Sequence, residues 1–264
     1  MSSSKAKRSE FFANVLRTQG VPVGKNTRVL DLGCGAGKLV QAAREQGYDF
    51  YGCGLGLRDA HTDADQGLVD QGILRDIDLD PYHLPFDDCT FDAVISDQVL
   101  EHVMDYPSTL REVHRVMKPG GAFLHIFPAR YMPIEPHVFV PLGTMIRQRW
   151  WLKTWAMMGV RNEFQTKMNA QEACEANHKY LTSHTNYLTK RQLREQFGQY
   201  YTDIRFVEDA FLRLSPRGRK IQGLTKVLPF LPKLYGAVGN RAAFGRRPTL
   251  TSAQPAALTF PAAS

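Results

Sequence analysis

The 264-residue chain has little of what marks a secreted or membrane-spanning protein. Its four cysteines form no Cys-x-x-Cys pair and no metal-binding spacing, which argues against a disulfide framework and against a zinc module. No apolar run approaches the roughly 20 residues that a membrane span needs, and the first residues do not resemble a signal peptide. We therefore expect a reduced, cytoplasmic protein.

Acidic residues are missing from a long C-terminal stretch. Residues 211–247 contain nine lysines and arginines but no aspartate or glutamate, and residues 223–238 are also apolar. A basic and apolar segment is typical of peripheral contact with an anionic membrane, which would place the protein at the inner membrane surface. A helix packed on the domain with solvated charges explains the same composition. Nucleic acid is disfavoured as a partner, because no RNA-binding module is present.

The most informative stretch is RVLDLGCGAG, at residues 28–37. An apolar strand-like run is followed by Gly33, Gly35 and Gly37, which let backbone N–H groups approach a ligand with no Cβ in the way. A phosphate loop would end in Gly-Lys-Ser/Thr, and a dinucleotide fingerprint would have its third glycine where Lys38 stands. The loop therefore predicts a small-molecule site of another kind.

VLDLGCGAG resembles the first motif of the class I S-adenosylmethionine (SAM)-dependent methyltransferases. Residues 84–103 look like the family's stretch that carries the adenine pocket and the fourth strand, and residues 111–128 look like the helix, turn and fifth strand behind it. The resemblance covers roughly residues 25–130. It implies a Rossmann-like α/β fold with a doubly wound, mostly parallel sheet, and SAM as the cofactor.

The same resemblance implies which residues hold SAM. Asp31 would lie near the methionine ammonium group, and Asp80, with Asp78 as the runner-up, would bond the adenine amino group. The family's ribose-binding acid is missing, because Gly54 holds its position. Asp59 is near enough in sequence to take its place. The full cofactor-binding set that we predict is Asp31, Gly33, Cys34, Gly35, Gly37, Gly54, Asp80, Leu84, Ser96 and Asp97.

The acceptor is expected beyond the fifth strand. Residues 128–143 have four prolines in sixteen residues, so they form a rigid loop that fixes Glu135 and His137. We predict that His137 acts as a base on an acceptor hydroxyl and that Glu135 orients it. A histidine that only bonds the loop backbone is the alternative. The loop is similar to one in bacterial methyltransferases associated with polysaccharide synthesis.

Glu101 and His102 lie in an element shared with quinone-type O-methyltransferases, in which a Glu-x-x-Glu-His run can hold a divalent metal. Gln98 takes the place of the first glutamate here. The loss of one carboxylate weakens a site for a hard cation, so we predict no metal. His125, within the fifth strand, is expected to be a core residue.

These observations predict one methyltransferase domain over residues 10–247, between disordered tails at 1–9 and 248–264. It would include a helical, aromatic-rich cap at 144–197 and the basic apolar segment at 211–247. The predicted function is SAM-dependent methyl transfer to oxygen of a small-molecule or surface-glycan acceptor. Two alternatives stay open: a lipid or quinone methyltransferase at the membrane surface, and a non-catalytic SAM-binding protein.

Overall fold

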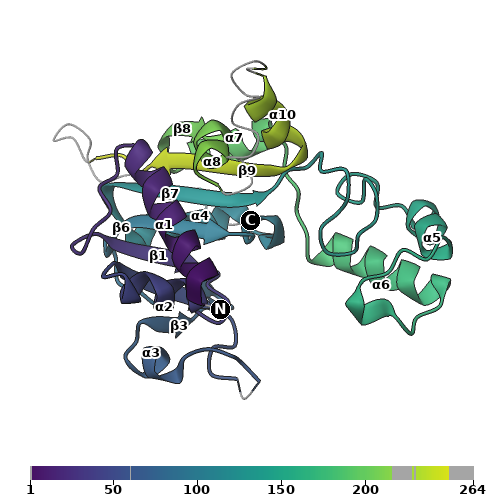
Figure 1. The fold of residues 1–264 in the computed structure, drawn as a ribbon, viewed down its shortest axis with the longest axis horizontal. Coiled ribbons are helices and arrows are strands. Elements are labelled where there is room, and N and C mark those ends of the chain that lie inside the picture. The colour runs from purple at the N-terminus through teal and green to yellow at the C-terminus, as the bar shows by residue number, and fades with distance from the viewer. Residues whose placement is uncertain (1, 60, 216–227, 229, 250–264) are drawn as a thin grey trace.

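A seven-stranded sheet forms the centre of the molecule in the computed structural model, which describes residues 2–59, 61–215, 228 and 230–249 (Figure 1). The strand order is β3-β2-β1-β6-β7-β9-β8. The strands are β1 (Arg28–Leu32), β2 (Asp49–Gly54), β3 (Leu74–Asp76), β6 (Phe91–Asp97), β7 (Met117–Pro128), β8 (Thr202–Phe206) and β9 (Asn240–Arg246), and a separate hairpin is formed by β4 (Asp78–Leu79) and β5 (Tyr82–His83).

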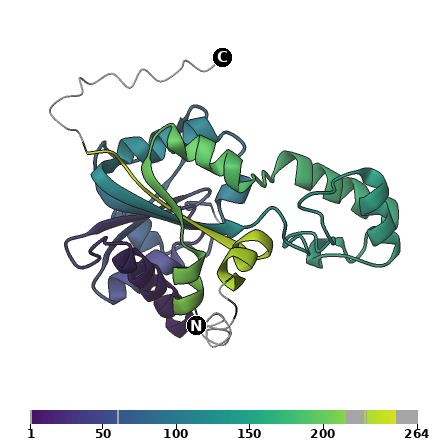
Figure 2. The same cartoon turned by 90° about the horizontal axis from the view of Figure 1, so that it is seen from above.

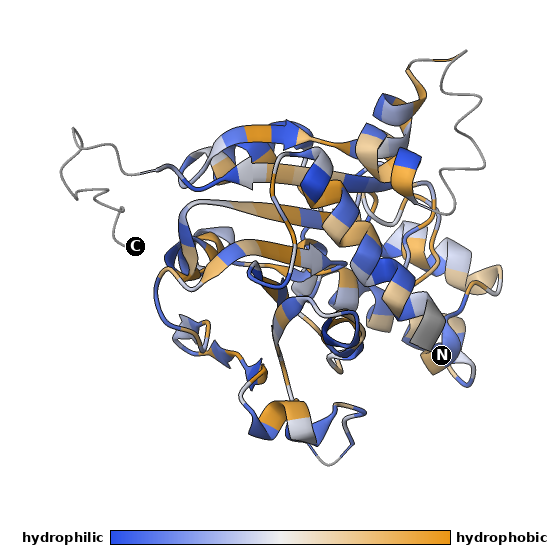
Figure 3. Cartoon of the chain, turned by 60° about the vertical axis from the view of Figure 1, so that its left-hand side comes forward, coloured by the Kyte–Doolittle hydropathy of each residue, from blue (hydrophilic) through white to orange (hydrophobic). Residues whose placement is uncertain are grey.

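Helices cover both faces of this sheet. They are α1 (Ser2–Thr18), α2 (Lys38–Glu45), α3 (Gln66–Asp70), α4 (Tyr106–Val116), α7 (Lys190–Gly198), α8 (Glu208–Leu214) and α10 (Leu231–Val238). One core cluster joins apolar residues of α1, α2 and α8 to the sheet, and a second joins α4 and α7 to its other face. Hydrophobic residues accordingly line much of the central strands (Figure 3).

Parallel pairing brings the strand carboxyl ends to one edge. The pairs β1–β2, β1–β6, β2–β3 and β6–β7 are parallel, and only β9 runs antiparallel to its neighbours β7 and β8. The chain winds outward from β1 in both directions, so the topological switch point lies between β1 and β6, where such folds bind ligands. The predicted doubly wound, mostly parallel fold is confirmed. The strand before the glycine loop and the fourth and fifth strands expected from the sequence are β1, β6 and β7, whereas β8 and β9 were not expected.

A helical lobe projects from the sheet beyond β7 (Figures 1 and 2). It contains α5 (Arg149–Met157), the short 3-10 helix η2 (Glu163–Gln165) and α6 (Ala170–Ser183). Its own small core includes Val138, Val140 and Leu152. The bounds of the lobe therefore differ from those of the predicted cap, 144–197, because the lobe core begins before residue 144. In addition, α7 packs on the body through Leu193 and Phe197.

The predicted tail at residues 1–9 is also wrong, because residues 2–18 form α1. Small polar residues suggested disorder, but long-range contacts hold this segment. Arg8 donates two hydrogen bonds to Asp97. Ser9 is fully buried and accepts a hydrogen bond from Gln46 at 2.8 Å. Most of the other predicted tail, 250–264, lies outside the described residues.

The basic segment at 211–247 is largely built into the fold where it is described. Strand β9 lies inside the sheet, and the Arg241 guanidinium is buried and faces Glu208 at 3.7 Å. Arg246 donates to the backbone oxygen of Gln19 at 2.8 Å. Residues 216–227, with four of the basic side chains, lie outside the described residues. Among the helices that are described, none is both long and apolar enough to cross a bilayer.

Candidate active site

The glycine loop follows directly from the end of β1. The N–H groups of Gly33 and Cys34 both donate to the carbonyl of Cys53 at 2.8 and 2.9 Å, which ties the loop to β2. Gly33 has φ +72°, and an added Cβ would collide with the side chain of Val99. Gly35 has φ +52°, but a Cβ there would meet no atom within 4 Å. Packing therefore requires a glycine at position 33, whereas position 35 faces open space.

Two carboxylates flank the loop at the ends of β1 and β6. Asp31 is 4% exposed, and burial raises its pKa to about 8, with a further contribution from Asp97. Arg8 of α1 donates to both carboxylate oxygens of Asp97, at 2.8 and 2.6 Å. A cationic ligand group beside Asp31 would offset the cost of ionising it. We call Asp31, residues 33–37, Gly54 and Asp97 the cofactor edge.

The structure leaves space for a side chain at Gly54, the position of the missing ribose-binding acid. A Cβ at Gly54 would make only ordinary contacts, the nearest being Cys34 Sγ at 3.5 Å, so packing does not demand glycine. The acid opposite Gly54 in the sheet register is Asp76, whose Oδ1 accepts the N–H of Leu57 at 2.7 Å. The suggested substitute, Asp59, is exposed on the loop that follows β2. Asp76 is thus a second candidate, visible only from strand pairing.

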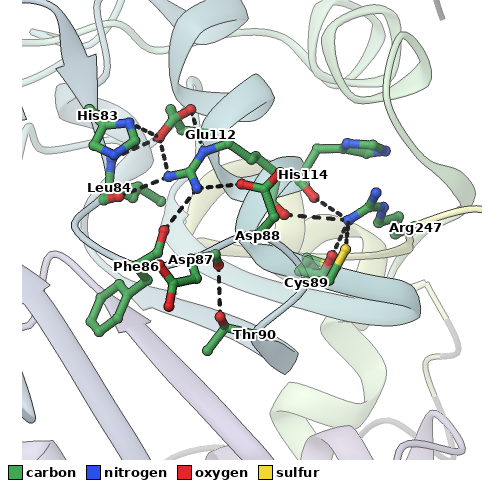
Figure 4. A network of polar contacts seen from close by, with 12 residues as sticks. His83, Leu84, Phe86, Asp87, Asp88, Cys89, Thr90, Glu112, His114 and Arg247 are labelled. Atoms are coloured by element: carbon green, nitrogen blue, oxygen red, sulfur yellow. Dashed lines mark hydrogen bonds and ion pairs between the residues drawn. The ribbon is translucent and has the colours of Figure 1, made fainter. Parts of the chain in front are cut away.

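Asp78 and Asp80 are exposed residues of the β4–β5 hairpin. The segment after the hairpin is fixed to α4 by a polar network (Figure 4). Leu84 is fully buried and its N–H donates to Glu112 Oε2 at 2.8 Å. Arg115 donates to Glu112, to Asp88 and to two backbone carbonyls of this segment. The hairpin is therefore held from one side, with its aspartates free of this network.

Ser96, another predicted cofactor residue, has its side chain in the core. Its hydroxyl is 2.8 Å from Nδ1 of His125, and both residues are fully buried. Burial lowers the pKa of His125 to about 3, so the imidazole is neutral. Any contact of Ser96 with a ligand would have to come from its backbone. His125 is a core residue, as predicted.

The loop at residues 128–143, which we call the lobe loop, brings Glu135 and His137 together with Tyr187. The buried Glu135 carboxylate accepts hydrogen bonds from His137 Nδ1 at 2.8 Å, from Tyr187 Oη at 2.6 Å, and from the N–H groups of His137 and Val138. Burial opposes ionisation of Glu135, but these hydrogen bonds leave its pKa below the ordinary value. Burial likewise lowers the pKa of His137, and the bond to Glu135 more than compensates, so the net shift is upward.

Across from this loop lies the 3-10 helix η1 (Leu100–His102). Glu101 is 1% exposed, and burial raises its pKa to about 7. The ring of His102 packs edge-on against that of His137, with centroids 4.8 Å apart. The backbone of Asn186, at the base of the lobe, donates to the carbonyl of Glu101 at 2.6 Å. We call Glu101, His102, Glu135, His137 and Tyr187 the junction.

One short segment connects the two halves of the site. Residues 97–102 begin at Asp97 on the cofactor edge, place Val99 against Gly33, and end at Glu101 and His102 in the junction. The sequence analysis found Glu135 and His137 but did not join them to Glu101 and His102. No local signal could have done so, because Glu135 and His137 are more than 30 residues from Glu101 and His102 in the chain.

Comparison with known proteins finds a family match for the part of the chain that contains the glycine loop. Residues 30–125 match the family described as Methyltransferase domain. The chain is 38% identical over 97 residues to 2-phytyl-1,4-naphtoquinone methyltransferase of Nostoc punctiforme, covering 35% of this chain and 42% of that protein. It is 36% identical over 103 residues to demethylmenaquinone methyltransferase of Listeria welshimeri, covering 38% and 44%. The matched residues are the part of the chain in which the glycine loop and the two later motifs resemble methyltransferases.

Among solved structures, the chain is similar to phosphoethanolamine N-methyltransferase 2 of Haemonchus contortus in complex with S-adenosylhomocysteine. The TM-score is 0.50 at 16% identity, covering 91% of this chain and 53% of that one. This likeness concerns the fold alone. The chain spans less than half the length of the two curated relatives, and the domain match ends at residue 125, before the lobe begins.

Proposed function

We propose that this protein is a SAM-dependent methyltransferase that transfers the methyl group to an oxygen of a small acceptor held at the junction. The observation that carries the proposal is the segment 97–102, which contacts the glycine loop through Val99 and the lobe through Glu101 and His102. This connection supports a donor site and an acceptor site at neighbouring positions. In-line transfer needs such proximity more than any other feature, because the sulfonium methyl is already activated.

The cofactor edge supplies the donor side of this proposal. Asp31 would pair with the ammonium group of SAM, and the open position at Gly35 would let the cofactor lie against the loop backbone. Leu84, Cys34 and Gly54 would line the remaining wall, with Asp76 or Asp59 serving the ribose hydroxyls and Asp80 or Asp78 the adenine amino group. Each of these contacts is a prediction that a substitution can test.

The junction supplies the acceptor side. His137 donates its Nδ1 proton to Glu135, which leaves Nε2 as the basic nitrogen of the neutral ring. We propose that Nε2 takes the proton of the acceptor hydroxyl while the oxygen attacks the methyl group, and that sulfur leaves with the C–S electron pair. Glu135 acts through His137, so it is a positioning residue. Tyr187 donates to Oε1, the same carboxylate oxygen that accepts the His137 proton.

Our choice of acceptor class is supported by a resemblance of the loop sequence and not by the names of the relatives. The quinone names belong to proteins that match this chain over about a third of its length. The loop at 128–143 is similar to one in polysaccharide-associated methyltransferases, which favours a small glycan. A lipophilic quinone is the second candidate, and the basic residues at 216–227 would then bind an anionic bilayer. Co-sedimentation with anionic vesicles at low and high salt separates the two acceptors.

The test begins with calorimetric titration of SAM and of S-adenosylhomocysteine into the purified protein. We expect one site per chain for each. A screen of hydroxylated sugars and quinols with labelled SAM follows, and methyl incorporation at oxygen is read by mass spectrometry. If neither SAM nor S-adenosylhomocysteine bound, the proposal would be refuted. Binding without transfer to any acceptor would favour the non-catalytic alternative.

A further inference from the structure

The carboxylate of Glu101 has an unusual environment. The side chain is almost fully buried, and neither of its oxygens has a hydrogen-bond partner among the described residues. Buried carboxylates are normally paired or hydrogen-bonded, because removing an unpaired carboxylate from water costs on the order of several kcal/mol. The contrast with Glu135 is direct, since Glu135 is equally buried and accepts four hydrogen bonds. Among the described residues, Glu101 therefore has no hydrogen-bond donor for its buried carboxylate.

Two imidazoles face this carboxylate, and each is held by its other nitrogen. Nδ1 of His102 lies 2.8 Å from the carbonyl oxygen of His184, which can only accept, so this nitrogen carries the proton. Nδ1 of His137 is held in the same way by Glu135 at 2.8 Å. Each neutral ring then keeps its lone pair on Nε2. Histidines that ligate metals are oriented by this kind of outer hydrogen bond to a carbonyl or carboxylate.

The three side chains converge. One possible ligand atom from each of Glu101, His102 and His137 lies within 4.8 Å of the other two. Ligands of one ion are separated by about 3–4 Å when each bond is near 2.0–2.2 Å. Small rotations of the side chains are therefore enough to bring all three onto a common centre.

We propose that Glu101, His102 and His137 form a binding site for a divalent transition-metal ion. Two imidazole nitrogens and one carboxylate oxygen suit Zn²⁺, Co²⁺ or Fe²⁺, whereas Mg²⁺ and Ca²⁺ prefer all-oxygen sites. Three protein ligands leave a coordination position for water or an acceptor oxygen. The site lies between η1 and the lobe, so an ion bound there also joins the lobe to the sheet.

The proposal goes beyond methyl transfer and changes one part of it. With an ion present, Nε2 of His137 is a ligand and is not available as a base. A metal-bound acceptor oxygen would lose its proton more readily by itself. The sequence argument against a metal compared only residues 98–102 with a known run of ligands. It could not include His137, which reaches the site from another part of the fold.

The test uses the whole protein after treatment with a chelator, titrated with ZnCl₂ or CoCl₂ in the absence of SAM. We expect one site per chain with micromolar or tighter affinity, and no competition by Mg²⁺. Glu101→Gln and His102→Ala should each weaken binding by at least about tenfold. His178→Ala is the matched control, because this lobe histidine bonds the backbone of Arg147 outside the cluster. Circular dichroism checks that each variant is folded.

Cobalt gives a second readout, since its visible spectrum depends on its ligands. The expected spectrum has weak bands typical of nitrogen and oxygen ligands. An intense near-ultraviolet band would indicate thiolate ligation by one of the free cysteines and would overturn the assignment. Equal affinity of the wild-type chain and Glu101→Gln, or no binding at all, would overturn it too. SAM titration of the chelated protein tests the cofactor edge separately, so the two proposals fail independently.

Discussion

The cofactor edge and the junction are built from the chain in opposite ways. The cofactor edge is mostly one continuous stretch, Asp31 to Gly37, which turns at the end of a buried strand. The junction joins η1 to a lobe loop and to Tyr187, which is more than 80 residues from Glu101. Backbone geometry defines the first site and side-chain packing defines the second. A substitution should therefore affect binding in the first and turnover in the second.

The largest expected effect is at His137. His137→Ala should lower turnover by roughly 10²–10⁴, the usual contribution of a general base, while the Kd of SAM changes by no more than about twofold. Glu135→Gln should cost less, because it only weakens the orientation of the ring. Steady-state kinetics with a verified acceptor, together with SAM calorimetry, measures both.

Chelation separates the two roles given to His137. If the histidine is the base, the wild-type chain keeps its turnover after dialysis against a chelator. If it is a metal ligand, turnover falls and returns when the ion is restored. Unchanged turnover in His137→Ala would remove both roles and end the functional distinction between the two regions.

The next effect tests the cofactor edge. Gly35→Val should weaken SAM binding by at least about 100-fold, because the added side chain would stand in the open space beside the loop. The fold should survive with a loss of about 1–2 kcal/mol, the cost of a positive φ at a residue with a Cβ. Gly24→Val is the matched control, since position 24 also has no atom within 4 Å of an added Cβ. Normal SAM binding by Gly35→Val would place the cofactor elsewhere.

A third test uses the buried carboxyl group of Asp31. Burial raises its pKa from 3.8 to about 8. The unfolded chain loses this proton at lower pH than the folded chain, so the free energy of unfolding falls as pH rises from about 4 to about 8. Asp31→Asn removes this loss. The variant should be more stable than the wild type at pH 8 by on the order of a few kcal/mol, and about equally stable near pH 4.

Thermal unfolding at several pH values gives the difference between the two proteins directly. The same variant should bind SAM less tightly, because the carboxylate that faces the ammonium group is gone. A stability difference that does not change with pH would mean that Asp31 is ionised throughout and that its burial is compensated. Gain of stability with loss of binding is the result that supports a functional role.

The smallest expected effect is at the hairpin. Asp80→Ala should raise the Kd of SAM by about fivefold, the equivalent of ~1 kcal/mol for one hydrogen bond. Asp78→Ala is the paired variant, because both side chains are exposed on the same hairpin. A larger effect at Asp78 would move the adenine contact by two residues. No effect at either position would leave the adenine to the backbone near Leu84.

Much of the body could be predicted from local patterns. The apolar runs at Leu30 and Val94 and the glycines after β1 specify parallel strands and a ligand-binding turn, because each acts within a few residues of itself. The first residues were misjudged for the opposite reason, because their composition suggested a tail, whereas Arg8 is held by Asp97 on β6. In the basic C-terminal segment, Arg241 is held by Glu208 on α8, a contact that composition does not reveal.

The sequence by itself determined the fold class, a doubly wound and mostly parallel sheet, and the position of the glycine loop, since these follow from periodicity and from glycines adjacent in the chain. Only the tertiary structure decided what surrounds Glu101, that Asp76 lies opposite Gly54 in the sheet, and where the lobe core begins. Those features depend on which side chains meet when the lobe packs beside η1. Contacts of that kind are set by the three-dimensional path of the chain, and no short stretch of residues encodes them.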